Sequence, residues 1–251
     1  METRENLDME EAFDNAGFKE KVISYNLGEW YIPNTWDRAD SLLWARGKVT
    51  EMNAVIGSAG GGNATLDFVK DGGLDKNGKT QVGLWRDHPV YDELLKYDLG
   101  FGTLVKERYI NVIRFIRDLK GVDFFVIREN RPKKGEDSKV LVVSQKGLAR
   151  VTRRLKDDVS YEYAYEVVKG NDPLGYVRDE KINKLIQSGY HDADAWFDAT
   201  AESAYPDAPF NFTTMFDTDR SGTLVVSMKT HWSVHSKIAD KHGGYNRQEM
   251  I

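Results

Sequence analysis

Cysteine is absent from this sequence of 251 residues. Disulfide bonds, thiolate zinc sites and cysteine nucleophiles all require that residue, so none of them can be built from this chain. The absence excludes thiol redox chemistry, but it gives no indication of the cellular compartment.

Long apolar runs and a basic excess are also lacking. No apolar stretch approaches the roughly 20 residues that a membrane-spanning helix needs, so we expect no membrane span. Residues 1–8 are polar and acidic, whereas an export signal has a basic start and an apolar run. The 35 Lys and Arg residues stand against 40 Asp and Glu residues, a formal charge of −5. This charge disfavours a nucleic acid polymer as partner.

The hydrophobic residues make up 40% of the chain, which is enough for a core. The spacing of apolar residues predicts a short amphipathic helix at residues 7–17. Residues 48–70 hold two apolar segments separated by glycines 60–62, and predict two strands joined by a tight turn. These glycines favour a turn over a phosphate cradle, because a cradle needs a helix after it and residues 65–69 are strand-like. Residues 71–79 predict a hairpin or loop rather than a calcium site.

The middle of the chain changes from a helical to a strand pattern. Apolar residues at 105–120 recur at intervals of three and four, which predicts a helix that ends at Gly121. The segment after it predicts antiparallel strands, with a turn at residues 129–138. The strands are expected at residues 122–127, 140–143, 148–155 and 160–168.

The last third of the chain predicts helices at residues 180–187 and 192–201, after a turn at residues 171–175. Residues 205–209 are expected to separate these helices from a final unit. That unit is a strand at residues 220–229 and a glycine-flanked loop, Lys241-His-Gly-Gly. Because glycines let backbone and ligand approach closely, such a loop can present an imidazole to a metal ion.

Three of the five histidines, His231, His235 and His242, fall within twelve positions. His231 and His235 are four apart, but their surroundings are typical of a strand end and a loop, where this spacing fixes no geometry. We expect both to be surface or loop residues rather than metal ligands. His88 and His191 are expected to be ordinary polar residues, with His191 near a helix N-cap. No Gly-x-Ser-x-Gly nucleophile motif occurs, and the 40 acidic residues single out no catalytic pair.

Several segments together resemble a known family. The C-terminal ones are Asp207-Ala-Pro-Phe-Asn-Phe-Thr-Thr-Met-Phe, Asp219-Arg-Ser-Gly-Thr-Leu-Val-Val-Ser, and Lys241-His-Gly-Gly with Arg247-Gln-Glu-Met-Ile. They resemble the C-terminal region of the type I phosphodiesterase/nucleotide pyrophosphatases of the alkaline phosphatase superfamily. Residues 7–17 resemble the segment that follows the family's Asp-His-Gly metal motif, and residues 55–62 resemble its next strand and glycine turn.

The resemblance implies a mechanism with two metal ions, usually zinc, held by Asp and His, and a Thr or Ser nucleophile that forms a phosphoryl-enzyme intermediate. The substrate would be a phosphoester or a nucleotide. One functional position matches this sequence: His242, as the family's last metal ligand. The Asp-His-Gly and nucleophile motifs have no counterpart, so we expect a chain truncated at both ends that is inactive alone.

The expected fold is α/β, a partial alkaline phosphatase-like core in a single incomplete domain over residues 1–251, with an inserted antiparallel β portion at residues 122–168. The expected function is that of a fragment of a metal-dependent phosphodiesterase/nucleotide pyrophosphatase. It would hold at most part of a zinc site, at His242, and no catalytic residue. The alternative is a non-catalytic α/β binding or interaction domain whose His-Gly-Gly loop is structural.

Overall fold

The computed structural model describes residues 89–95, 111–218 and 222–230, together with short strands outside these ranges. Those strands are β1 (Glu5–Asn6), β2 (Ser41–Trp44), β3 (Arg46–Gly47), β4 (Met52–Gly60), β5 (Asn63–Leu74), β6 (Thr80–Leu84), β7 (Asp98–Phe101), β8 (Arg108–Asn111) and β14 (Trp232–Ser233). The helix predicted at residues 7–17 lies outside the described residues.

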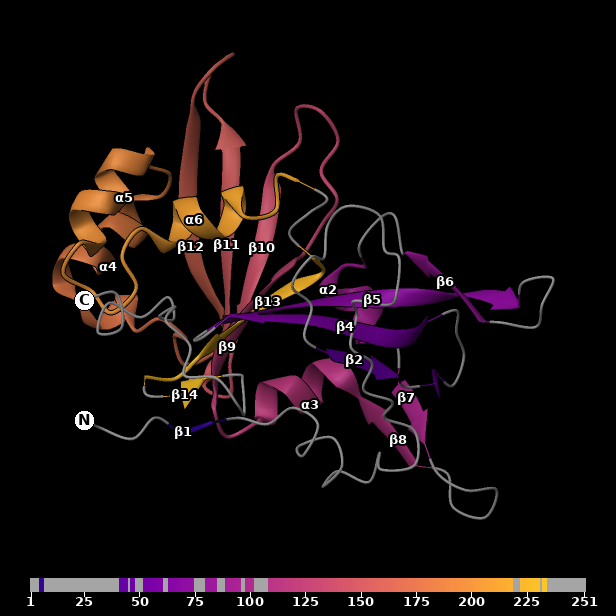
Figure 1. Cartoon of the computed structure of the whole chain (residues 1–251). Helices are drawn as coiled ribbons and strands as arrows, with labels where there is room; N and C mark the ends of the chain where they lie inside the picture. The colour runs from indigo at the N-terminus through magenta and orange to yellow at the C-terminus, as the bar shows by residue number, and fades with distance from the viewer. Residues whose placement is uncertain are drawn as a thin grey trace.

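The main sheet is antiparallel and has the strand order β12-β11-β10-β9-β13-β5-β4-β2, with β6 paired to β5 (Figure 1). Its remaining strands are β9 (Val122–Arg128), β10 (Ser138–Val143), β11 (Gly147–Leu155), β12 (Tyr161–Gly170) and β13 (Leu224–Met228). Strands β9 to β12 form a meander. The much later strand β13 then pairs with β9 on one side and β5 on the other, so that Val226 lies opposite both Phe125 and Ala64.

The burial of each strand follows its sequence pattern. The apolar run of β9 is buried at five of seven positions, as expected for a strand covered on both faces. In β12, by contrast, Tyr163 and Tyr165 are buried while Glu162 and Glu166 face the other way. The meander therefore changes from a two-sided core at β9 to a half-exposed sheet at β12.

Four short helical elements cover one face of the meander: η3 (Tyr176–Arg178), α4 (Glu180–Ser188), α5 (Ala193–Thr200) and α6 (Ala208–Thr214). Helix α6 crosses strands β10, β11 and β12 (Figure 1). The core between sheet and helices contains Phe124, Val126, Val140, Val142, Ala149, Val151, Tyr163, Tyr165, Leu174, Tyr176, Ile182, Trp196, Tyr205, Ala208, Phe212 and Phe216. Burial of each large side chain stabilises the fold by about 1.5–3 kcal/mol.

Capping side chains fix where helices α4 and α5 begin. Asp179 caps α4, because its Oδ1 accepts the Ile182 N–H at 3.0 Å. Asp192 caps α5 in the same way, accepting the Ala195 N–H at 2.9 Å. Such caps stabilise a helix by about 1 kcal/mol each.

The opposite face of the sheet is buried at its β9 and β13 end. Phe125, Ile127 and Leu141 alternate with the residues that face α4 to α6, and each is at most 2% exposed. Helix α3 (Val112–Asp118) packs against β9. A short helix, α2 (Tyr91–Leu94), is tied to the start of α3 by hydrogen bonds from Asn111.

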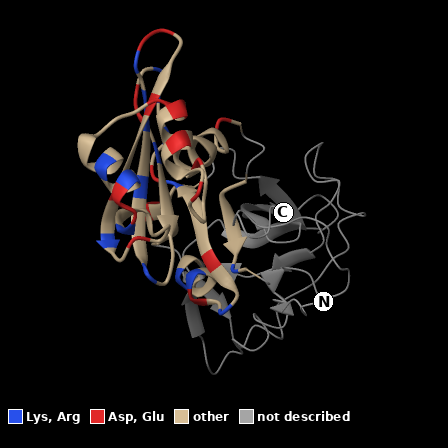
Figure 2. Ribbon diagram, turned by 90° about the vertical axis from the view of Figure 1, so that its left-hand side faces the viewer, with Lys and Arg blue, Asp and Glu red and all other residues tan. Residues whose placement is uncertain are grey.

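Charged pairs occupy the exposed part of that face. Arg150 on β11 donates to Glu129 at 2.5 Å and to Glu166 on β12 at 2.7 Å. Arg154 pairs with Glu162 at 3.0 Å. Figure 2 shows Lys and Arg interspersed with Asp and Glu over the described part of the chain, with both signs close together.

One predicted helix is partly wrong. Residues 108–111, expected to be helical, form strand β8, which pairs with β7, and the helix begins only at Val112. The cause is Asn111, whose Oδ1 accepts the Arg114 N–H at 3.2 Å and caps the helix there. Helix α6 was not predicted at all, because residues 205–209 suggested only a separator.

The other predicted elements that fall on described residues are confirmed. Strands β9 to β12 and helices α4 and α5 lie within a few residues of their expected bounds. The two strands predicted on either side of glycines 60–62 are confirmed, since β4 and β5 pair antiparallel with Gly60 opposite Asn63, and residues 61–62 lie outside the described residues. Of the predicted hairpin or loop at residues 71–79, residues 71–74 belong to β5, which pairs antiparallel with β6, and residues 75–79 lie outside the described residues.

The structure thus shows a mixed α/β fold built on an antiparallel sheet with several short helices. Strands β1 and β14 add one parallel pair. Among the described residues, no helix is both long and apolar enough to cross a membrane.

Candidate functional site

Strand β13 is the described part of the unit expected to carry His242. Leu224 and Met228, at its two ends, are both 0% exposed. The strand lies between β9 and β5, in the interior of the sheet. His242 itself lies outside the described residues, so its role as a metal ligand stays a prediction.

His88, His231 and His235 also lie outside the described residues. In the part that the structure describes, no three or more His, Cys, Asp or Glu side chains converge in a way that could hold a metal ion. The described residues therefore do not by themselves form the zinc site that the resemblance implies.

His191 has a structural position. Its backbone exchanges hydrogen bonds with Tyr163 on β12, at 2.7 Å and 3.0 Å, and so covers the edge of the sheet there. The next residue, Asp192, is the N-cap of α5. The prediction that His191 lies near a helix N-cap is confirmed.

His191 and Ser188 form the one contact in this region that resembles a nucleophile and its base. The Oγ of Ser188 lies 2.8 Å from His191 Nε2 and 2.9 Å from the carbonyl oxygens of Lys184 and Leu185. The imidazole tautomer decides which group donates in the contact between Ser188 and His191, whereas the hydroxyl can only donate to the two helix carbonyls. The pair stabilises the end of α4.

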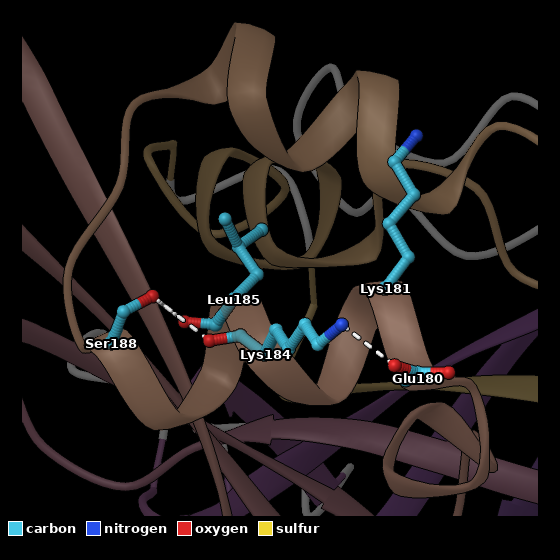
Figure 3. Close-up of a pocket in the computed structure, with 5 residues that line it drawn as sticks. All are labelled: Glu180, Lys181, Lys184, Leu185 and Ser188. Carbon is cyan, nitrogen blue, oxygen red and sulfur yellow. Dashed lines mark hydrogen bonds and ion pairs between the residues drawn. The ribbon is translucent and has the colours of Figure 1, made fainter.

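A surface depression on α4 is the next candidate (Figure 3). It is lined by Glu180, Lys181, Lys184, Leu185 and Ser188. Lys184 Nζ pairs with Glu180 Oε1 at 2.6 Å, and Lys181 points away from that pair and donates to the carbonyl of Asp198. Its cationic groups are therefore occupied by neighbouring oxygens, and the pair is so exposed that its energy is small.

Asp172 and Tyr165 form a buried polar cluster beneath η3. The carboxylate of Asp172 accepts the Leu174 N–H at 3.0 Å, the Val177 N–H at 2.9 Å and the hydroxyl of Tyr165. Burial, followed by the negative charge of Asp172, raises the pKa of Tyr165 well above its usual value. The two N–H bonds hold the turn at residues 171–175 and η3, and the Tyr165 bond ties both to β12, so the cluster is structural.

Asp207, at the start of α6, is different. Its φ of 53° is positive, and its Oδ1 is buried with no hydrogen-bond partner. Burial, followed by the charge of Asp194, raises the pKa of Asp207 from 3.8 to about 6. Perturbed carboxyl groups of this kind occur often at functional positions.

The sequence reasoning missed Asp207 as a candidate. An aspartate two residues before a proline, as in Asp207-Ala-Pro, is a helix-start signal and could have predicted α6. No sequence signal reports that one carboxyl oxygen is buried without a partner, because that depends on how α6 packs on the sheet.

Comparisons with protein-family models, with curated proteins and with solved structures found no match. The assignment of function therefore depends on the residues of this chain.

Proposed function

We propose that this chain is part of a metal-dependent phosphodiesterase or nucleotide pyrophosphatase, with His242 as a zinc ligand. The observation that carries the proposal is the resemblance of the segments around Asp207, Asp219 and Lys241 to the C-terminal region of that family. The described part of the second of these segments supports it, because it forms strand β13, which is buried and lies in the interior of the sheet.

The helix-sheet body also supports the proposal. Residues 207–214, at the start of the first resembling segment, form the N-cap and body of α6, which packs on the meander. Residues 224–227 of the second segment form most of β13, next to β9 in the same sheet. The described part of the first segment thus packs on the sheet that contains the described part of the second.

The same proposal limits what these residues do. The sequence contains no Asp-His-Gly motif and no nucleophile motif of the family, and one imidazole alone binds zinc weakly. The other ligands and the nucleophile would come from residues outside these 251. This chain contributes one ligand and the sheet that holds it, and no catalytic step is assigned to its own residues.

The coding sequence upstream of the codon for Met1 tests this proposal. We expect an open reading frame that continues upstream and encodes an Asp-His-Gly motif and a Thr or Ser nucleophile. A stop codon in frame, directly before the codon for Met1, would contradict the proposal, because the remaining ligands would then have no source in the same polypeptide.

The alternative is a non-catalytic binding or interaction domain. It is favoured by the hairpin of β11 and β12, which exposes Leu155, Val159 and Tyr161 by 46%, 87% and 45%. Exposed apolar side chains that lie together are typical of protein contact surfaces. This alternative predicts that changing Val159 and Tyr161 to Ser abolishes binding to the partner, whereas His242→Ala leaves that binding unchanged.

A further inference from the structure

The connection between α5 and α6 ends in an unusual backbone position. Among the described residues, Asp207 is the non-glycine residue with a positive φ, at φ 53° and ψ 29°. Its N–H donates to the Oγ1 of Thr200 at 2.7 Å, and that hydroxyl donates to the carbonyl of Trp196 at 2.7 Å. Thr200 and Trp196 are both 0% exposed. The start of α6 is thus fixed to the buried side of α5.

This backbone position directs the Asp207 carboxyl inward. Its Oδ1 is buried and has no hydrogen-bond partner, although a carboxylate oxygen normally accepts at least one bond. Desolvation of a charged oxygen without a partner is costly, whereas the neutral carboxyl tolerates the same site. The burial of Oδ1 without a partner therefore favours the protonated form.

The surrounding charges act in the same direction. Helix α5 presents Asp194, whose negative charge opposes ionisation of Asp207. Strand β12 presents Tyr163, whose phenol is also disfavoured as an anion by Asp207. Strand β11 presents Arg153, but its guanidinium is held by Asp217 beyond the end of α6, with Nη1 to Oδ2 at 2.8 Å.

Strand β10, which also packs against α6, contributes the apolar Val140 and Val142 to the core. Arg153 on β11 is therefore paired with Asp217 rather than with Asp207. Burial and the charge of Asp194 oppose ionisation of Asp207, and its buried Oδ1 has no hydrogen-bond partner.

We propose that Asp207 makes the α5–α6 connection a pH-sensitive switch. With a neutral carboxyl, α6 stays docked on β10, β11 and β12; with a charged carboxyl, the start of α6 separates more readily from the core. The switch does not depend on the zinc assignment, because it involves described residues alone.

The direction of the pH effect follows from the raised pKa. The folded-state pKa of about 6 exceeds the ordinary value of 3.8, so the folded state binds the proton more tightly than the unfolded state. The stabilising contribution of the proton is complete below the ordinary value and is lost as the pH rises through about 6. Because the side chain is half-buried, we expect an effect smaller than the full shift, about a tenfold change in the opening equilibrium of α6.

Hydrogen exchange of the α6 amides tests this switch. Exchange rates are measured at pH 5 and pH 8 and divided by the intrinsic rate at each pH, which leaves the opening equilibrium. In the wild type we expect α6 to open about tenfold more at pH 8 than at pH 5. In Asp207→Asn this difference should disappear, since Asn tolerates a positive φ and carries no charge.

Two further variants make the test decisive. Asp207→Gly also suits the positive φ and removes the carboxyl, so it should abolish the pH dependence even if the asparagine variant folds poorly. Asp198→Asn removes an exposed charge from α5 and should leave the wild-type pH dependence unchanged. A wild type whose α6 opens equally at both pH values would overturn the proposal. Retention of the pH dependence in both Asp207 variants, or its loss in Asp198→Asn, would do the same.

Discussion

At the scale of single residues, buried polar side chains that bind backbone groups fix the local structure most strongly. Asp172 is the clearest case, because two N–H groups and one phenol converge on one carboxylate that is 9% exposed. The cluster fixes the turn between β12 and the helices. Asp207 is its opposite, a carboxyl whose buried oxygen receives no bond.

The hydrogen bonds of Asp172 predict that the conservative substitution Asp172→Asn lowers stability markedly. In Asp172→Asn one oxygen is replaced by an NH2 group, which cannot accept, so at least one buried donor loses its partner. We expect the free energy of unfolding to fall by about 1–3 kcal/mol, measured by urea denaturation. Asp158→Asn, an exposed change on the β11–β12 turn, is the control and should have almost no effect. Equal stability of the two variants would mean that the cluster does not hold the turn.

The two carboxylates also show how far the sequence can be read at this scale. The sequence 171–175 predicts a turn, because Asn, Asp, Pro and Gly favour one, and the turn is present. That Asp172 would bind Tyr165 could not be predicted, since the phenol reaches it only when β12 packs beneath η3. Burial of polar atoms depends on tertiary contacts that local patterns do not contain.

At the scale of elements, Asn111 decides where α3 begins. It caps the helix through the Arg114 N–H, and its Nδ2 donates to the carbonyls of Leu94 and Leu95, at 3.0 Å and 3.2 Å. One side chain thus ends β8, starts α3 and holds α2. The helical spacing of apolar residues at 105–120 predicted the buried Ile113 and Ile116 correctly, but periodicity does not report a cap.

Two substitutions of Asn111 separate its roles. Asn111→Ala removes the cap and the bonds to α2, and should lower the free energy of unfolding by about 2 kcal/mol. Asn111→Ser restores a good N-cap but is too short to reach α2, so its loss should be smaller. Thermal and urea unfolding of the three proteins measure this order. If serine is as destabilising as alanine, the cap contributes nothing.

Helix α6 could not be predicted from the helix propensity of its own residues. Its seven residues, Ala-Pro-Phe-Asn-Phe-Thr-Thr, contain aromatic and threonine residues with modest helix propensity. Packing of Phe212 compensates, since its ring lies 5.5 Å from that of Phe124 on β9 and the side chain is 1% exposed. Strands β9 to β12 could be predicted because their patterns alternate or run apolar over several residues. A short helix that tertiary contacts stabilise could not.

At the scale of the whole molecule, the described residues are organised around one nine-stranded antiparallel sheet whose burial changes along its width. The β12 end is half-exposed and covered on one face by α4 to α6, and at β9 and β13 both faces are buried. The mixed α/β class could be predicted from the sequence. The insertion of β13 between β9 and β5 could not, because this strand order depends on contacts between segments about 100 residues apart (β13 and β9) and about 160 residues apart (β13 and β5) in sequence.

The proposed function makes a prediction for the whole chain. Without a nucleophile and with a single matched ligand, the purified protein should not hydrolyse bis-p-nitrophenyl phosphate above the uncatalysed rate, with or without added zinc. The release of p-nitrophenolate measures this directly. Robust turnover that His242→Ala abolishes would show that the chain contains a complete site.

The central claim is that His242 is a zinc ligand. Its most direct measurement is zinc titration of the protein labelled with 15N in its histidines, with the imidazole signals assigned by His242→Ala and His231→Ala. We predict that zinc, although bound weakly by this chain, shifts the His242 signal at a lower concentration than the other four histidine signals, and that His242→Ala abolishes this first shift while His231→Ala leaves it intact. Equal and weak responses of all five histidines, unchanged by His242→Ala, would contradict the claim.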